Sequence, residues 1–84
     1  MNAQQAVAER IRELLAQSGM TLNKLSIESG VAKSVLHGTL VGNPPRVQNT
    51  SIRTIQKICQ VFDLSLRDFF DTELFDSIEN EDEK

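Results

Sequence analysis

The sequence predicts an all-α domain of five short helices, followed by a short acidic tail. Apolar residues recur at helical spacing in successive segments, and in the first segment Val7, Ile11 and Leu14 stand four and three residues apart. Glycines or short polar stretches end these patterns, as glycine commonly does after a helix. A chain of 84 residues with 39% hydrophobic residues has room for one core. We therefore expect one domain over residues 1–71 and a partly disordered tail over residues 72–84.

The first two helices are expected over residues 3–17 and 22–29. Ser18-Gly19 ends the first pattern. The second begins after Thr21, a residue type that commonly caps helix N-termini, and it ends at Ser29-Gly30. The expected core residues of the two helices are Val7, Ile11, Leu14, Leu15, Leu22, Leu25 and Ile27.

The third helix is expected from about Ala32 to Val41, with Gly42 as its end. Its composition does not favour a helix, because it contains several β-branched residues and Gly38, and a glycine alone costs about 1 kcal/mol relative to alanine. Tertiary packing must therefore hold this helix, or it orders partly on binding. Its expected core residues are Val31, Leu36 and Leu40.

The last two helices follow a polar loop over residues 43–50 that contains two prolines. The fourth helix begins after a cap at Thr50 or Ser51. In the fifth helix, Ser65 and Asp68 have the spacing of a capping box. The expected core residues are Ile52, Ile55, Ile58, Cys59, Val61 and Phe62 in the fourth helix and Leu66, Phe69 and Phe70 in the fifth.

The tail divides into two parts. Residues 73–78 could add one or two helical turns, and their apolar side chains could cover the domain, form a dimer contact or do little. These side chains are Leu74, Phe75 and Ile78. Residues 79–84 contain no apolar side chain, so we expect them to be disordered.

The net charge of −3 averages two different regions. Residues 1–70 carry eight basic and five acidic side chains, a net charge of +3. Residues 71–84 carry seven acidic side chains and only Lys84, a net charge of −6. The domain is therefore mildly basic, which is compatible with a nucleic-acid partner.

Several classes of function find no support in the sequence. No apolar run approaches the roughly 20 residues that a membrane span needs, and residues 1–5 do not begin a signal peptide. The single cysteine, Cys59, cannot form an internal disulfide; we expect a core thiol in a cytoplasmic protein. Metal-ligand spacing, a nucleophile–base pair and a glycine-rich phosphate loop are also missing from the sequence. We therefore expect no enzyme activity, cofactor, metal, membrane or small-molecule ligand.

The most specific pattern runs from Thr21 to Gly42. Two short helical patterns meet there at Gly30. A short glycine-containing turn between two helices is the sequence form of a helix-turn-helix. The second helix of such a motif can enter the major groove of DNA.

Residues 7–70 resemble the phage-repressor-type (Cro-like, xenobiotic-response-element) family of helix-turn-helix domains. The resemblance rests on the spacing between Gly30 and Gly42 and on the closing segment from Phe62 to Phe70. Further matching positions are Met20, Thr21, Leu25, Val31, Ser34, Leu36, Ile55, Lys57, Ile58 and Cys59. The resemblance implies a five-helix, lambda-repressor-like fold that binds double-stranded DNA.

The resemblance also nominates the residues of the third helix that would face base edges. They are Lys33, Ser34, Val35, His37 and Gly38. Lys33 can donate to guanine, Ser34 can bond either base type and Val35 can meet a thymine methyl group. Gly38 would let the backbone approach closely. His37, the only histidine, either contacts phosphate or base or is an ordinary exposed or half-packed side chain.

Phosphate contacts are expected from the N-terminus of the second helix, which offers free backbone N–H groups, and from the polar loop. The expected residues are Thr21, Asn23 and Lys24 in the second helix and Arg46, Gln48 and Asn49 in the loop, with Arg53 as a further candidate. By contrast, Arg10 and Arg12 are expected to pair with Glu9 and Glu13 on the face of the first helix.

These residues favour a DNA-binding transcriptional regulator. We expect a repressor that acts as a homodimer and inserts residues 32–41 into the major groove. The alternative is a protein-interaction module of the same fold, antitoxin-like or regulator-binding, with little direct DNA binding. Mild basicity and Leu22, where the family often has glutamine, favour this alternative. The acidic tail is either a solvated segment or a competitor of DNA for the basic face.

Overall fold

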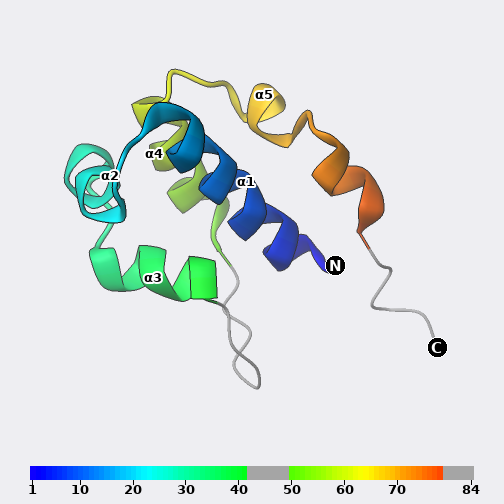
Figure 1. Cartoon of the computed structure of the whole chain (residues 1–84), viewed down its shortest axis with the longest axis horizontal. Coiled ribbons are helices and arrows are strands. Elements are labelled where there is room, and N and C mark those ends of the chain that lie inside the picture. Colours follow the sequence, from blue (N-terminus) through cyan, green and yellow to red (C-terminus); the bar gives the residue numbers. More distant parts are fainter. Residues whose placement is uncertain (42–49, 79–84) are drawn as a thin grey trace.

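The computed structural model describes residues 1–41 and 50–78, and all of its regular elements are helical (Figure 1). They are α1 (Ala3–Ser18), α2 (Leu22–Ser29), α3 (Lys33–Val41), α4 (Ile52–Val61), α5 (Leu66–Phe70) and the 3-10 helix η1 (Glu73–Ser77). The five expected helices are confirmed with bounds within a residue or two. In Figure 1, α3 and α5 lie on opposite sides of α1.

The ends of the helices follow from local hydrogen bonding. Gly19 after α1 and Gly30 after α2 have φ of 70° and 76°, in the left-handed region that glycine adopts at little cost. The predicted cap Thr21 accepts the backbone N–H of Lys24. Two further predicted caps, Ser51 and Ser65, each accept the backbone N–H three residues on. Ser51, and not Thr50, is therefore the cap of α4.

The cap of α1 was not among the sequence-based expectations. The Asn2 side chain accepts the backbone N–H of Gln5, and the Gln5 side chain accepts the backbone N–H of Asn2, both at 2.8 Å. This reciprocal pair is a capping box formed by asparagine and glutamine instead of the more familiar serine and glutamate.

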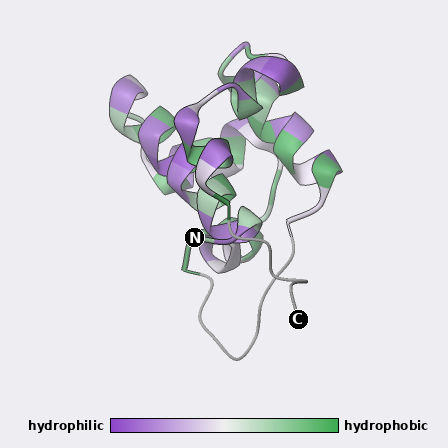
Figure 2. Cartoon of the chain, turned by 90° about the vertical axis from the view of Figure 1, so that its right-hand side faces the viewer, coloured by the Kyte–Doolittle hydropathy of each residue, from purple (hydrophilic) through white to green (hydrophobic). Residues whose placement is uncertain are grey.

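The core lies between the helices, and hydrophobic positions alternate with hydrophilic ones along them (Figure 2). Its buried members are Val7, Ile11, Leu14, Leu25, Val31, Leu36, Ile55, Ile58, Cys59 and Phe69. Burial raises the pKa of the Cys59 thiol, and the charge of Arg10 opposes this shift only in part. Cys59 is thus a core thiol, as expected.

Three residues expected in the core are exposed instead. Ile27 is 70% exposed because it follows the buried Leu25 by two residues, which places it on the opposite side of α2. Ile52 is 61% exposed and Leu66 is 36% exposed. Both are the first residues of short helices, α4 and α5. The apolar stripe of each helix begins before the part of the helix that packs against the core. The helical period alone did not show where the buried part of each stripe starts.

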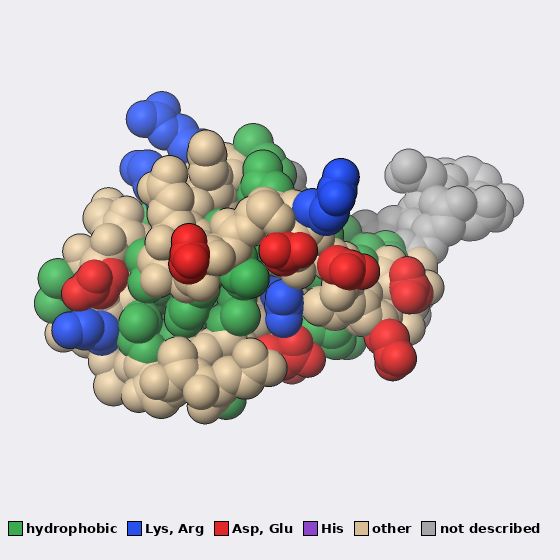
Figure 3. Space-filling model, turned by 90° about the horizontal axis from the view of Figure 1, so that it is seen from above, with side chains coloured by type: hydrophobic (Ala, Val, Ile, Leu, Met, Phe, Trp, Pro, Cys, Tyr) green, Lys and Arg blue, Asp and Glu red, His purple; other side chains and the backbone are tan. Residues whose placement is uncertain are grey.

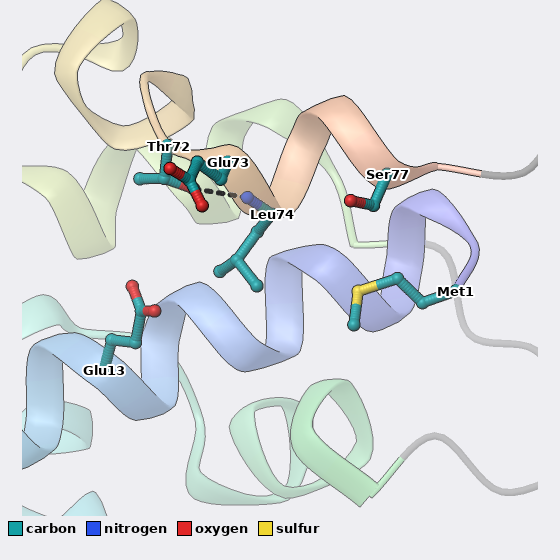
Figure 4. A pocket seen from close by; sticks show the side chains of 6 residues that line it. All are labelled: Met1, Glu13, Thr72, Glu73, Leu74 and Ser77. Atoms are coloured by element: carbon teal, nitrogen blue, oxygen red, sulfur yellow. Dashed lines mark hydrogen bonds between the residues drawn. The ribbon is translucent and has the colours of Figure 1, made fainter.

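Leu74 and Phe75 cover the domain, which was one of the three alternatives for this segment, whereas Ile78 is 37% exposed. The Phe75 ring lies 4.8 Å from the Phe70 ring and 6.2 Å from the Phe69 ring, measured between centroids. Leu74 points toward α1 beside an open groove between η1 and α1 (Figure 4). The division of the chain at residue 71 stays a prediction, and residues 79–84 lie outside the described part of the chain.

We predict that Phe75→Ala lowers the free energy of unfolding by about 2 kcal/mol, because it removes a partly buried ring from an aromatic cluster. Urea unfolding followed by circular dichroism measures this. The matched control is Ile78→Ala, which truncates an exposed apolar residue of the same segment and should change the free energy by less than about 0.5 kcal/mol. A change for Phe75→Ala as small as that expected for the control would mean that η1 does not stabilise the domain.

Candidate nucleic-acid interface

The turn between α2 and α3 is fixed by side-chain hydrogen bonds and by an apolar contact. The Ser26 hydroxyl donates to the carbonyl oxygen of Val31 at 2.7 Å, and the Ser29 hydroxyl accepts the Val31 N–H at 3.1 Å. Leu25 and Leu36, one from each helix, are fully buried beside Val31. Figure 1 shows α2 nearly end-on and α3 from the side, so the two axes are steeply inclined. The geometry is that of a helix-turn-helix.

One face of α3 is buried and the other is open. Leu36 and Thr39 are buried against the rest of the domain. Four of the five residues expected to face bases, Lys33, Ser34, Val35 and His37, are exposed, and Gly38 is half-buried. The structure thus leaves the expected side chains accessible, and their contact with DNA stays a prediction.

The N-terminus of α2 is also accessible. Thr21, Asn23 and Lys24 are exposed, and the oxygen of Thr21 caps the helix. Lys24 lies 3.5 Å from Glu28, but both side chains are solvent-exposed, so this ion pair is weak and can be exchanged for a phosphate contact. The N-terminus of a helix further favours an anion through its dipole.

Three of the remaining expected phosphate contacts, Arg46, Gln48 and Asn49, lie outside the described residues. Arg53 is exposed in the first turn of α4. The structure therefore brings the α2 and α3 candidates together on one motif, and the contacts of the loop candidates stay a prediction.

Charge is unevenly distributed over the molecule. The segment 21–41 carries Lys24 and Lys33 against one acidic residue, Glu28. On the face seen from above, away from α3, acidic side chains gather toward the half that carries η1 (Figure 3). Among the described residues, no group of histidine, cysteine, aspartate or glutamate side chains is placed to hold a metal.

Sequence reasoning missed the residues of α1 that hold other helices. Arg10 and Arg12 pair with Glu13 and Glu9 at 3.4 and 3.0 Å, as expected. Arg10 also donates to the carbonyl oxygens of Phe69 and Asp68, and Arg12 donates to that of Leu40. Backbone acceptors carry no sequence signal, so the second set of bonds could not be foreseen from residue types.

The comparisons with known proteins agree with this geometry. Residues 10–74 match the Cro/C1-type helix-turn-helix DNA-binding domain. The chain belongs to this family. As a member, it is a DNA-binding regulator in general terms, and its lambda-repressor-like, all-helical fold is confirmed.

A solved structure supports the assignment. The chain is similar to the prophage Lp1 protein 11, known from a crystal structure, with a TM-score of 0.77 and 26% sequence identity. The similarity covers 93% of this chain and 100% of that protein. No curated protein matches the chain. Among the residues that the structure describes, none of the helices has the length and hydropathy that crossing a membrane requires.

We predict that Gly30→Ala weakens DNA binding more than Gly19→Ala does, although both cost about 1 kcal/mol of folding stability. Both glycines have positive φ, and a methyl group added at either would meet no atom within 4 Å, so the cost is that of the backbone conformation. Only Gly30 lies in the turn that orients α3.

Thermal unfolding and fluorescence anisotropy with a duplex, measured on both variants well below their melting temperatures, check this comparison. If the two variants lose the same affinity, the α2–α3 turn does not set the binding geometry.

Proposed function

We propose that the protein is a sequence-specific transcriptional repressor that inserts α3 into the major groove of double-stranded DNA as a homodimer. The observation that carries this proposal is the open face of α3, where Lys33, Ser34 and His37 are accessible while Leu36 and Thr39 anchor the opposite face. A rigidly held helix with donors on its outer face suits readout of base edges.

The N-terminus of α2 supplies the second part of the proposal. Thr21, Asn23 and Lys24 offer donors to the phosphate backbone, which would set the register of α3 in the groove. Homodimer formation is proposed because a single small module buries little surface on DNA, and two half-sites together give useful affinity.

A second candidate function is protein interaction through the same face. Val35 and Val41 on α3 are 45% and 44% exposed, and such side chains suit a protein partner as well as a thymine methyl group. Salt dependence separates the two, because contacts to phosphates weaken steeply with salt and apolar protein contacts do not.

We predict that the protein binds a random 20-base-pair duplex at low salt and that Lys24→Ala, which removes an expected phosphate contact, reduces the magnitude of the slope of log K against log [salt] by about 1. Fluorescence anisotropy over a series of salt concentrations measures the slope. The charge-matched control is Arg67→Ala on α5, which is exposed and lies across α1 from α3, and which should leave the slope unchanged. Failure of the wild-type protein to bind duplex at low salt would refute the proposal in favour of protein interaction.

We further predict that selection from a pool of random duplexes enriches an inverted repeat whose half-sites stand about one helical turn, or roughly 10 base pairs, apart. This spacing follows from a two-fold dimer that presents one α3 to each half-site. Sequencing of the bound fraction gives the repeat. A single half-site would contradict the homodimer, and the absence of any enriched motif would contradict sequence-specific readout.

A further inference from the structure

Gln4 of α1 joins two parts of the chain that flank the segment 42–49. Its side-chain nitrogen Nε2 donates to Thr50 Oγ1 at 2.7 Å and to the carbonyl oxygen of Thr39 at 3.4 Å. Its Oε1 accepts the backbone N–H of Thr50 at 2.9 Å. Because a backbone N–H can only donate, this last bond determines which way the carboxamide is oriented. Gln4, Thr39 and Thr50 form what we call the Gln4 cluster.

The Gln4 cluster is closed and largely removed from solvent. Thr50 Oγ1 donates to Thr39 Oγ1 at 3.3 Å, and Thr39 Oγ1 donates to the carbonyl oxygen of Val35 at 3.0 Å. Thr39 is only 4% exposed, and the other two residues are half-buried. Removal of one member therefore leaves polar groups without partners at a site partly shielded from water. The free-energy cost is larger than that of losing a hydrogen bond in water.

A second hydrogen bond to α3 comes from Arg12, which lies eight residues after Gln4 on α1. Arg12 donates to the carbonyl oxygen of Leu40, one of the last carbonyls of α3. These carbonyls have no partner within their own helix, and the negative end of the helix dipole favours a cation there. Ala8 lies between Gln4 and Arg12 on the same stripe and is buried, so its small side chain lets α1 and α3 approach closely.

The C-terminal half of α3 needs such support. Its residues from Gly38 to Val41 include a glycine and β-branched side chains, which disfavour a helix. The first half is anchored by the fully buried Leu36, whereas Leu40 in the second half is only partly buried against the core, and the bonds from Gln4 and Arg12 add to that contact. Loss of these bonds would loosen the end of α3 while the core stays folded.

We propose that Gln4 is a positioning residue for DNA binding: it holds the C-terminal half of α3, and through it the orientation of the exposed face, without touching DNA. The claim that Gln4 holds α3 rests on the hydrogen bonds alone. The claim that Gln4 affects DNA binding also rests on the proposed function. When only a fraction of the molecules has α3 in place, the apparent affinity is the intrinsic affinity multiplied by that fraction.

The first test is hydrogen exchange of Gln4→Ala followed by NMR. We expect the amides of Leu40 and Val41 to exchange about tenfold faster, while those of Ile58 and Cys59 in the core of α4 stay unchanged. The matched control is Gln17→Ala, the same substitution at an exposed position near the other end of α1, which should change neither set. Unchanged exchange in α3, or an equal rise in all amides, would overturn the proposal.

The second test is DNA affinity, measured by anisotropy with the random duplex at low salt. We expect Gln4→Ala to weaken binding about fivefold with no change in the salt slope, because no phosphate contact is lost. Thr50→Val removes the two bonds that Thr50 Oγ1 makes with Gln4 and Thr39 but leaves the bond from Gln4 to the Thr39 carbonyl, so we expect a smaller loss than with Gln4→Ala. The double variant should lose no more than Gln4→Ala alone, since both substitutions act on one unit. Additive losses would show that Gln4 acts elsewhere, and they would overturn the proposal.

The two tests keep the two claims apart. If the wild-type protein does not bind duplex, the proposed function fails, and the exchange measurement still decides whether Gln4 holds α3. If Gln4→Ala does not fold, Thr50→Val takes its place in the exchange experiment, because valine keeps the shape of threonine and the backbone N–H remains. Faster exchange confined to Leu40 and Val41 supports the proposal there too, and its absence refutes it.

Discussion

The structure depends on one shared core to which every α-helix contributes a fully buried large side chain. These side chains are Ile11, Leu25, Leu36, Ile58 and Phe69, from α1 to α5 in order. The helices are between 5 and 16 residues long, and helices of this length are marginal in water when isolated. Each therefore forms because the others cover its apolar side, and none can move far without opening the core.

Around this core, α1 holds the weaker helices by their C-terminal ends. Arg10 donates to the last carbonyls of α5 and packs over the Phe69 ring, 5.8 Å from its centroid. Gln4 and Arg12 bond the last carbonyls of α3. Hydrophobic burial has no preferred direction, whereas hydrogen bonds do, so these polar contacts fix how the helices are oriented around the core. An exposed face on α3 is useful for recognition only if the helix is held in this way.

Much of the fold could be predicted from the sequence, because helix caps and helix-ending glycines act locally. Gly19, Gly30 and Thr21 are examples, since the conformation or bond that each supplies involves residues within four positions. Burial could be predicted less well, as Ile27 and Ile52 show, because it depends on where neighbouring helices begin and end. The packing of Phe75 could not be chosen among its alternatives for the same reason.

The candidate site was foreseen in outline only. The accessibility of the α2 and α3 residues follows from the motif, and the structure agrees with it. The contacts of Gln4 and Arg12 with α3 were not foreseen, because their acceptors are mainly backbone atoms far away in sequence. Bonds of this kind appear only when the helices are placed in space, although they decide how the reading face is held.

The central claim is that the exposed face of α3 meets DNA. The most direct test is a titration of the isotope-labelled protein with duplex DNA, followed through the backbone amide shifts in NMR spectra. We expect the largest shifts at Lys33, Ser34, Val35 and His37, with smaller shifts at the N-terminus of α2 and none on α5. Shifts concentrated on α5 or η1, with α3 unaffected, would contradict this account.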